Sequence, residues 1–359
     1  MKKILLASVA LTAFAGAAAA EVSFSGSASL GYNDTTGGDN DGFYWAGTVN
    51  TTFAAELDNG LTAGATVNFE VEDNGAANTA SANTGIALDS DDFVVFVKSG
   101  DAAVYFGDTT TAGAKYWTAA GDMESDGFTT DAFDAAEVDA VLRGDMSYGS
   151  VSLSVSTLVV ADEAEQLSFS AKAALGAVTL SAAYEEATTT ITEGGDANDD
   201  EIFGLAAGFS AAGADIVVAY AEDENSDSTG LKVTYPMGDV KVTAYYVSES
   251  VGDDNYGVNV AYAAGAVAVA LDYQDDQGTT KVALDGSYDL GNGLTVLAGV
   301  YDEENAGTDT YVAASYDLGG GAALLVSYAD AEVAGNIADD EIGANDYQVG
   351  TTVELSFAF

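Results

Sequence analysis

The side chains able to do chemistry in this chain are almost all carboxylates. Its 359 residues include 58 Asp and Glu against 9 Lys and Arg, and they contain neither His nor Cys. Disulfides, thiolate chemistry and the nitrogen and sulfur ligands of zinc are therefore excluded. An active site would have to use carboxylates alone or a Ser–Lys pair, and no nucleophile motif is present. The sequence indicates that the chain is not an enzyme.

Oxygen ligation of a hard cation is the chemistry that remains open. Calcium prefers carboxylate oxygens, and Asp122, Glu124 and Asp126 alternate within one long stretch that has no repeating pattern. No EF-hand spacing is present, however, and a run of acidic residues is most often a solvated surface. We therefore expect no required cofactor, and a calcium ion at these three carboxylates is a hypothesis.

The formal net charge of −49 limits the classes of partner. Nucleic acid is excluded, because its phosphates need clustered Lys and Arg. Disordered acidic chains combine high charge with low hydrophobicity, whereas 48% of these residues are hydrophobic and the mean hydropathy is +0.12. The acidic residues therefore belong to a folded protein.

The N-terminal segment has the pattern of a signal peptide. A basic start with Lys2 and Lys3 precedes an apolar run, and Ala18 and Ala20 form a small-residue cleavage site before Glu21. The run is too short, and wrongly flanked, for a membrane-spanning helix. We expect a cleaved signal peptide at residues 1–20 and a single domain at residues 21–359.

Alternation by twos dominates the rest of the chain. Residues 22–32 place Val22, Phe24 and Leu30 on one face and serines on the other, and the segments 61–71, 150–159 and 347–359 alternate similarly. This period predicts β-strands, and the spacing of an amphipathic helix is absent from these segments. Counting all such segments gives 20 strands. No segment after residue 20 approaches the ~20 apolar residues that a membrane helix needs.

Turns and tyrosines indicate that the strands close into a membrane barrel. Short turn signals such as Asp58-Asn59-Gly60 alternate with longer acidic connections such as 72–91, 274–278 and 302–309, and tyrosines on the apolar faces precede both kinds. Short turns at one rim, longer loops at the other and an aromatic band at each are the layout of outer-membrane barrels. We predict an all-β protein, a transmembrane antiparallel up-and-down β-barrel of 16–20 strands. Its polar faces would line an aqueous lumen, because side chains cannot fill so wide a barrel.

Most basic residues of the predicted strands fall on the polar, inward faces. A Lys or Arg that faces lipid near the bilayer midplane costs about 2–4 kcal/mol, so inward placement is expected. The parity of Lys98 is ambiguous, because both faces of its segment are apolar. The residues predicted to line the lumen wall are Glu70, Arg143, Lys172, Lys232, Lys241 and Lys281.

The stretch from Asp108 to Asp139 is the longest connection without alternation. It contains Tyr116, Trp117 and Phe128, which indicate packing rather than free solvation. We hypothesise that this third long loop folds into the lumen and narrows it, with Arg143 and the inward lysines facing its carboxylates. The alternative is an exposed acidic loop. The residues predicted to form the constriction are Asp108, Lys115, Asp122, Glu124, Asp126, Asp131, Asp134, Glu137 and Asp139.

Several segments carry a resemblance to a known family. They are the opening Glu21–Tyr32, the junction Phe106-Gly107-Asp108, the stretch Ser315–Gly321 and the aromatic end Phe357-Ala358-Phe359. Together with the overall pattern, they make the chain similar to Gram-negative general diffusion porins of the alphaproteobacterial, Rhodobacter-like type. Barrels of that family have about 16 strands, fewer than this sequence predicts.

The resemblance implies where the protein acts and with what. It implies the outer membrane of a Gram-negative bacterium, reached through the periplasm, with contacts to outer-membrane lipid and lipopolysaccharide. It also implies a homotrimer, a constriction formed by the third loop, and recognition of Phe357 and Phe359 by the barrel-assembly machinery.

The expected function is passive diffusion of small hydrophilic solutes and ions through an outer-membrane porin. The excess of carboxylates predicts a preference for cations. Two alternatives remain open: a substrate-specific outer-membrane channel, and an exported acidic β-rich surface protein.

Overall fold

A computed structural model describes residues 21–35, 42–72, 93–129, 138, 140–161, 163–188, 200–330 and 347–359. The expected signal peptide at residues 1–20 lies outside the described residues. Within the described ranges the chain forms twenty β-strands and one short helix, α1 (Ala112–Tyr116). No helix in these ranges is long and apolar enough to cross a membrane.

The strands are mostly nine to thirteen residues long. In order they are β1 (Glu21–Asn33), β2 (Gly42–Glu56), β3 (Thr62–Glu72), β4 (Phe93–Lys98), β5 (Ala102–Gly107), β6 (Ala140–Tyr148), β7 (Val151–Val160), β8 (Glu163–Leu175), β9 (Val178–Glu185), β10 (Ile202–Ala211), β11 (Ala214–Glu222), β12 (Asp227–Met237), β13 (Val240–Glu249), β14 (Asn255–Ala264), β15 (Val267–Asp276), β16 (Thr279–Gly291), β17 (Leu294–Glu303), β18 (Gly307–Gly319), β19 (Ala322–Asp330) and β20 (Gly350–Ala358).

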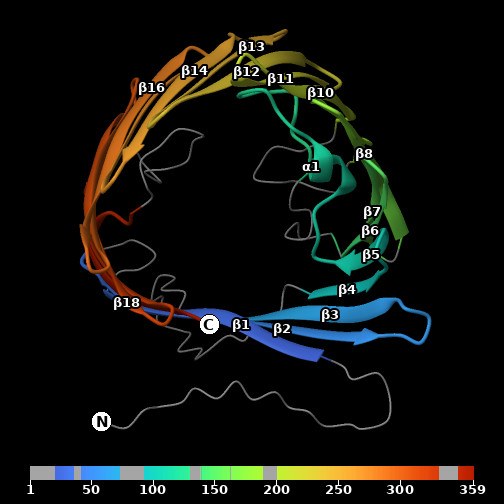
Figure 1. Cartoon of the computed structure of the whole chain (residues 1–359), viewed down its shortest axis with the longest axis horizontal. Coiled ribbons are helices and arrows are strands. Elements are labelled where there is room, and N and C mark those ends of the chain that lie inside the picture. Colours follow the sequence, from blue (N-terminus) through green and yellow to red (C-terminus); the bar gives the residue numbers. More distant parts are fainter. Residues whose placement is uncertain are drawn as a thin grey trace.

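Each strand pairs antiparallel with its neighbours in the sequence, and the first pairs with the last. In that closing pair Ser27 lies opposite Ala358 and Tyr32 lies opposite Val353. The sheet therefore closes into the ring of strands seen in Figure 1. The predicted up-and-down barrel is confirmed, with a strand number at the upper end of the predicted range.

The end of the chain completes the seam between β1 and β20. Gly26 and Phe359 exchange both of their backbone hydrogen bonds, each at 3.0 Å. A Cβ on Gly26 would overlap the backbone of Thr48, so this close approach requires glycine. At the other rim the N–H of Thr351 donates to the Asp34 carboxylate at 2.6 Å, and this bond lowers the pKa of Asp34 from its ordinary value.

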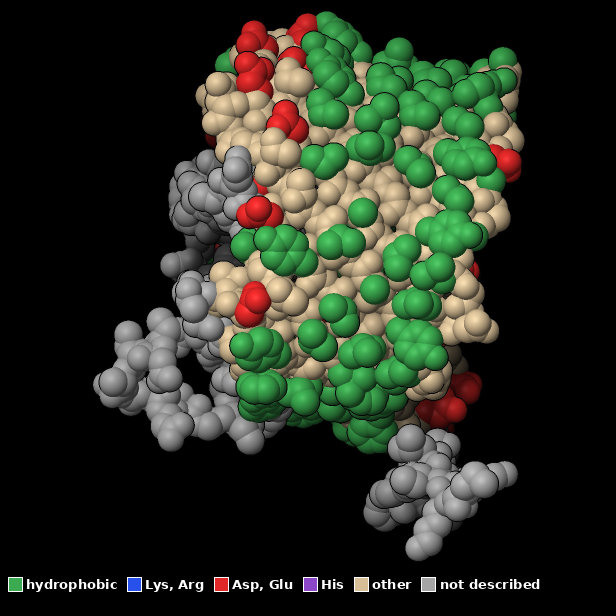
Figure 2. All heavy atoms as spheres, turned by 90° about the vertical axis from the view of Figure 1, so that its left-hand side faces the viewer, with side chains coloured by type: hydrophobic (Ala, Val, Ile, Leu, Met, Phe, Trp, Pro, Cys, Tyr) green, Lys and Arg blue, Asp and Glu red, His purple; other side chains and the backbone are tan. Residues whose placement is uncertain are grey.

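Apolar side chains cover the outside of the barrel. Leu30, Leu271 and Val312 are 54%, 46% and 55% exposed, because they point away from the lumen. Figure 2 shows the side around β14–β18, where hydrophobic side chains spread over the face and no Lys or Arg is visible. An apolar outer surface of this kind fits a wall that faces hydrocarbon.

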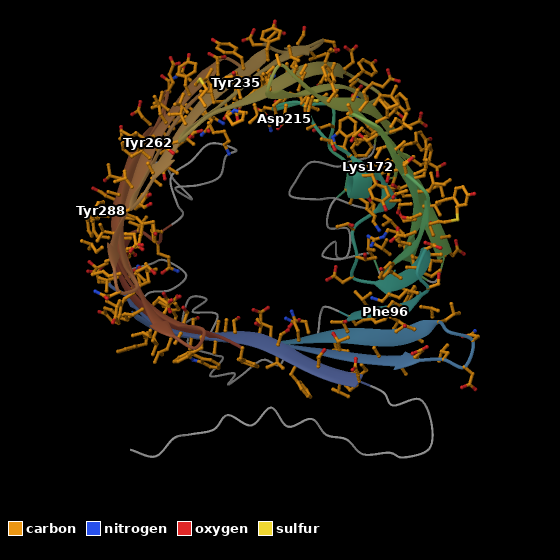
Figure 3. The ribbon with its side chains drawn as sticks, in the orientation of Figure 1. Phe96, Lys172, Asp215, Tyr235, Tyr262 and Tyr288 are labelled. Carbon is orange, nitrogen blue, oxygen red and sulfur yellow. The ribbon has the colours of Figure 1, made fainter. Side chains whose placement is uncertain are left out.

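Tyrosines mark both rims of this apolar surface. Figure 3 shows Tyr262 and Tyr288 on the outer side of the wall, whereas Lys172 and Asp215 lie on the lumen side. Rings with a polar tip suit the boundary between lipid and water. At the loop rim the phenol hydroxyls donate to carboxylates: Tyr184 to Glu201, Tyr220 to Glu222, Tyr246 to Asp254 and Tyr256 to Asp275.

The loop rim is less uniform than the sequence predicted. Between β15 and β16 only Gln277 and Gly278 connect the strands, and between β17 and β18 only residues 304–306 do so. The acidic residues expected in these loops instead extend the strands, as where Asp276 pairs with Thr279. The expectation of longer connections at 274–278 and 302–309 is therefore wrong. Acidic residues can continue a strand at this rim, because their side chains remain in water there.

The described part of the connection from β5 to β6, residues 108–129, lies inside the barrel. In Figure 1, α1 lies within the ring of strands, beside β8, and it contacts β7, β8 and β9. Further along the loop, Ala120 and Met123 pack against Ala219 of β11 and Val247 of β13. The third loop therefore folds into the lumen as predicted, and the alternative of an exposed loop is wrong.

Candidate functional site

The inner wall carries the polar residues of the alternating strands. Lys98 points inward, since it shares a face with the buried Phe96 and its ammonium group lies 4.0 Å from the centre of that ring. The register also gives inward parity to the residues predicted for the lumen wall. They are Glu70, Arg143, Lys172, Lys232, Lys241 and Lys281.

Serines of the wall hold the start of the loop. The backbone N–H of Ala112 donates to Ser156 Oγ at 2.8 Å, and that of Gly113 donates to Ser168 Oγ at 2.6 Å. These donors belong to the first turn of α1, where a helix has no internal partner for them. The hydroxyl of Ser170 donates to the carbonyl of Ala112. The serine alternation of β7 and β8 therefore supplies the hydrogen bonds that fix α1.

A buried carboxylate holds the other end of the described loop. Glu185, the last residue of β9, has no exposed surface and accepts hydrogen bonds from the N–H and the hydroxyl of Thr129, at 3.0 and 2.5 Å. The hydroxyl of Thr111 donates to the carbonyl of Thr129 at 2.7 Å, which ties the two ends of the loop together. Loss of one partner would leave a buried polar group without a bond, at a cost of about 1–3 kcal/mol.

Glycines of the wall let the loop lie directly on the strands. A Cβ on Gly204 in β10 would overlap the indole ring of Trp117, and a Cβ on Gly230 in β12 would overlap the backbone of Ala120. Trp117 also packs against Phe128, with ring centroids 5.2 Å apart. At these two points the loop lies directly against the backbone of the wall. Its position therefore depends on glycine at both wall positions.

The basic residues near α1 pair with a carboxylate of the wall. Lys115 of the loop forms an ion pair with Asp145 of β6, and Arg143 Nε lies 3.4 Å from the same carboxylate. Arg143 also donates through Nη1 to the carbonyl of Thr110 at 2.6 Å. Among the described residues the carboxylate beside Arg143 belongs to the wall, and the hypothesis that Arg143 faces the carboxylates of the loop stays a prediction for Asp131, Asp134, Glu137 and Asp139, which lie outside the described residues. At this point the loop supplies a cation and the wall supplies the anion.

Three carboxylates meet where the loop reaches β15. Oxygen atoms of Asp122 and Glu124, from the loop, and of Asp276, from β15, lie within 4.8 Å of one another. Wall amides orient the two loop residues: Gln274 Nε2 donates to Asp122 at 2.8 Å and Asn255 Nδ2 donates to Glu124 at 2.9 Å. The wall therefore supports an oxygen-rich group on the loop.

This group differs from the trio that the sequence predicted. Asp126 does not belong to it, because its carboxylate accepts a hydrogen bond from the indole N–H of Trp117 at 2.9 Å. The third carboxylate of the group is Asp276. Its Oδ2 lies 2.6 Å from Nζ of Lys281 in β16. Spacing within the loop could not reveal this exchange, because Asp276 comes from a strand far along the chain.

The remaining predicted residues lie elsewhere. Asp108 begins the loop, and its N–H donates to the carbonyl of Phe93 at 2.7 Å. Phe357 and Phe359, at the end of the chain, are 46% and 69% exposed. Four predicted loop residues lie outside the described residues: Asp131, Asp134, Glu137 and Asp139.

Four wall carboxylates that contact or approach the loop were not predicted from the sequence, namely Asp145, Glu185, Glu249 and Asp276. All four have inward parity in the register, so alternation could have placed them on the lumen side. Their height relative to the loop depends on how the strands are staggered around the barrel, and alternation carries no information about stagger.

These features define a class of protein. A closed barrel with an apolar outer face, a polar inner face and a loop held inside the lumen is a transmembrane channel, because water fills the space that side chains leave.

Comparison with known proteins places the chain within that class. A family model described as Gram-negative porin matches residues 7–308, so the chain belongs to the Gram-negative porin family. It is an outer-membrane channel for passive diffusion, not a surface protein.

The similar solved structures include two variants of the porin of Rhodopseudomonas blastica. One shares 18% identity with a TM-score of 0.46, and the other shares 17% identity with a TM-score of 0.42. Each alignment covers 94% of this chain and 100% of the other chain. No curated protein matches this chain.

The contact between Gly204 and Trp117 generates a test of how the loop is held. In a Gly204→Ala variant the added methyl group overlaps the Trp117 ring. Overpacking of this kind costs about 1–3 kcal/mol, so we expect the loop to move off the wall and into the lumen. Single-channel recordings in planar bilayers should show lower conductance and more current noise.

The control is Gly208→Ala on the same face of β10, where the nearest atoms lie 4.0 Å from the added methyl group. It should conduct as the parent does. Equal conductance in both variants would contradict the seating of Trp117 on Gly204.

Proposed function

We propose that the chain is a general diffusion porin that prefers cations and is narrowest at the loop between β5 and β6. The position of that loop carries the proposal, because the loop lies inside the lumen and is fixed to the wall at both described ends. Its residues 108–129 contain four carboxylates, Asp108, Asp122, Glu124 and Asp126, and one basic residue, Lys115. An acidic loop at the narrowest point would concentrate cations there.

The ion pairs of the described residues support the same sign of selectivity. Lys115, Arg143 and Lys281 lie within ion-pair distance of the wall carboxylates Asp145 and Asp276. Their positive charge is therefore partly offset by these two carboxylates, which weakens the attraction of anions from the lumen. Hydrated solutes would pass by diffusion, selected by the width of the constriction and by its field. At physiological salt that field decays over about 8 Å, so selectivity would be strongest for ions near the loop.

Reversal potentials in asymmetric potassium chloride test the preference for cations. We expect a cation-selective reversal potential that shrinks as total salt rises, because screening weakens the field. The double variant Asp122→Asn and Glu124→Gln should be less cation-selective than the parent at the same salt concentration. Asp58→Asn, in the turn between β2 and β3, should have the selectivity of the parent. Anion selectivity in the parent channel would refute the proposal.

We also propose that calcium binds where the loop meets β15. The donor set fits this ion, since Asp122, Glu124 and Asp276 offer hard oxygen ligands within 4.8 Å of one another. Repulsion among the three carboxylates is partly offset by Lys281, which forms an ion pair with Asp276. A divalent cation would relieve that repulsion and fasten the loop to the wall.

Isothermal titration of the purified channel with calcium measures this site. We expect Asp276→Asn to weaken calcium binding about tenfold or more, on the scale of ligand-shell substitutions. Asp126→Asn serves as the control and should bind as the parent does, because the amide oxygen can still accept from Trp117. Equal weakening by both substitutions, or no binding by the parent, would rule out the proposed ligands.

We further propose a homotrimer that buries the outer face of β4 and β5. These two strands have only six residues each, whereas a strand that crosses a bilayer needs about 9–11. Their outward side chains Val95, Val97, Val104 and Phe106 are nevertheless exposed and apolar. Because β4 and β5 are too short to span the bilayer, we expect another copy of the chain to cover their outer face.

Cross-linking tests this arrangement, because the chain has no Cys of its own. Val104→Cys in the isolated membrane should give covalent oligomers with a bifunctional maleimide, and light scattering of the detergent-solubilised protein should give the mass of three chains. Leu271→Cys, on β15 and similarly exposed, should remain monomeric after cross-linking. Cross-linking at Leu271 but not at Val104 would contradict the interface.

The route to the membrane completes the proposal. Residues 1–20 would direct export to the periplasm and be removed there. Phe357 and Phe359 would then be recognised by the barrel-assembly machinery, in keeping with their exposure at the closing strand. In the outer membrane the apolar wall would contact lipid and lipopolysaccharide.

A further inference from the structure

A recess in the lumen wall lies between the loop and strands β12–β15. Its volume is about 430 Å³, within the range of about 300–1,000 Å³ that is typical of small-molecule sites. Asp122 lines the recess on the side of the loop. Polar side chains of four strands line the rest: Lys232, Thr234, Lys241, Thr243, Asn259 and Asp272.

A clamped aromatic ring gives this recess a fixed wall. Tyr245 of β13 lies between the loop and the neighbouring strand, and a Cβ on either Gly121 or Gly257 would overlap its ring. Gly121 has a φ of +105°, a conformation that disfavours any other residue at this point of the loop. Because the ring cannot turn without moving the loop, the recess is formed before a solute arrives.

Two lysines of the recess differ from Lys115, Arg143 and Lys281, the basic residues that form ion pairs. Within the described residues the ion pairs involve Lys115, Arg143 and Lys281, and none involves Lys232 or Lys241. Lys241 is exposed to the lumen and Lys232 is half-buried. Their ammonium groups are therefore available to an anion that enters the recess.

Neutral and acidic groups complete the recess. Thr234 and Thr243 face each other across β12 and β13 with their hydroxyl oxygens 3.1 Å apart. Asn259 donates to the Asp272 carboxylate at 2.5 Å, which leaves the other oxygen of Asp272 as an acceptor. Hydroxyl groups of a solute can donate to Asp272 and both donate to and accept from the threonines.

We propose that this recess is a weak binding subsite for small hydroxylated carboxylates, the chemical class of sugar acids. The two lysines would hold the carboxylate through charge-assisted hydrogen bonds, which are stronger than neutral ones. The threonines, Asn259 and Asp272 would hold the hydroxyls. The subsite deepens the proposed channel function and rests on it, because the solute reaches the recess through the lumen.

A local anion subsite is compatible with a lumen that prefers cations. Selectivity for simple ions follows the summed field at the constriction, whereas retention in the recess depends on direct hydrogen bonds over about 3 Å. A sugar acid would therefore enter less often than a cation of equal size but remain longer.

Current block by gluconate tests the subsite. Potassium gluconate is added to the parent channel in planar bilayers, with potassium acetate as the carboxylate without hydroxyls and sorbitol as the polyol without a carboxylate. We expect a saturable reduction of the potassium current with gluconate alone. In the double variant Lys232→Gln and Lys241→Gln, the half-blocking concentration should rise about tenfold or more, the equivalent of losing about 1.4 kcal/mol.

Lys172→Gln is the matched control, because Lys172 also points into the lumen but lies on β8, outside the recess. It should be blocked as the parent is. The subsite is overturned if gluconate does not block the parent, if acetate or sorbitol blocks equally well, or if Lys172→Gln loses block to the same extent as the double variant.

A protein that conducts no potassium would contradict the channel function, not the subsite. Isothermal titration of the detergent-solubilised, folded protein with gluconate then tests the subsite. The parent and Lys172→Gln should bind gluconate with equal affinity, and the double variant should bind it more weakly. Equal heats for all three would overturn the subsite.

Discussion

The structure depends on one constraint, the need for every backbone N–H and C=O within hydrocarbon to find a partner in the protein. Water is absent from the bilayer core, so a sheet can exist there only without edges. The pairing of β1 with β20 removes the last two edges, and Gly26 with Phe359 extends that pairing to the end of the chain. The apolar outer face and the polar inner face both follow from closing an alternating sheet in this way.

Closure also explains why the loop between β5 and β6 is so important. A barrel of this width leaves an interior that its own side chains cannot fill, so the wall alone would set only a wide opening. The loop is held by neutral hydrogen bonds that its N–H groups donate to Ser156 and Ser168, and by the buried Glu185. Close contact at Gly204 and Gly230 holds it as well. Charge holds the loop at a separate point, where Lys115 forms an ion pair with Asp145 of the wall. The loop can therefore be acidic without being expelled from an acidic lumen.

The sequence was sufficient for the strands, the barrel and the inward loop, because each depends on a local pattern. Alternation by twos assigns a residue to one face of a strand, and that was enough to place Lys172 or Lys232 on the lumen side. It was not enough to predict that Asp276, and not Asp126, joins Asp122 and Glu124. Contacts between a loop and a wall depend on the height of each residue around the barrel, which is set by the stagger of all the strands together. The connections at 274–278 and 302–309 were misassigned for a related reason, since acidic residues continue a strand wherever it rises into water.

The seam between β1 and β20 has a consequence for how the barrel forms. In the described part of the chain every other pairing joins strands that are consecutive in the sequence, so the hairpins involve contacts of low order that can form early and independently. Only the seam requires the two ends of the domain to meet, and the entropy of closing so long a loop is lost in that single step. Closure of the barrel therefore depends on the residues at the two ends of the domain. Until they meet, the chain presents two open strand edges, the form in which it is most prone to aggregate.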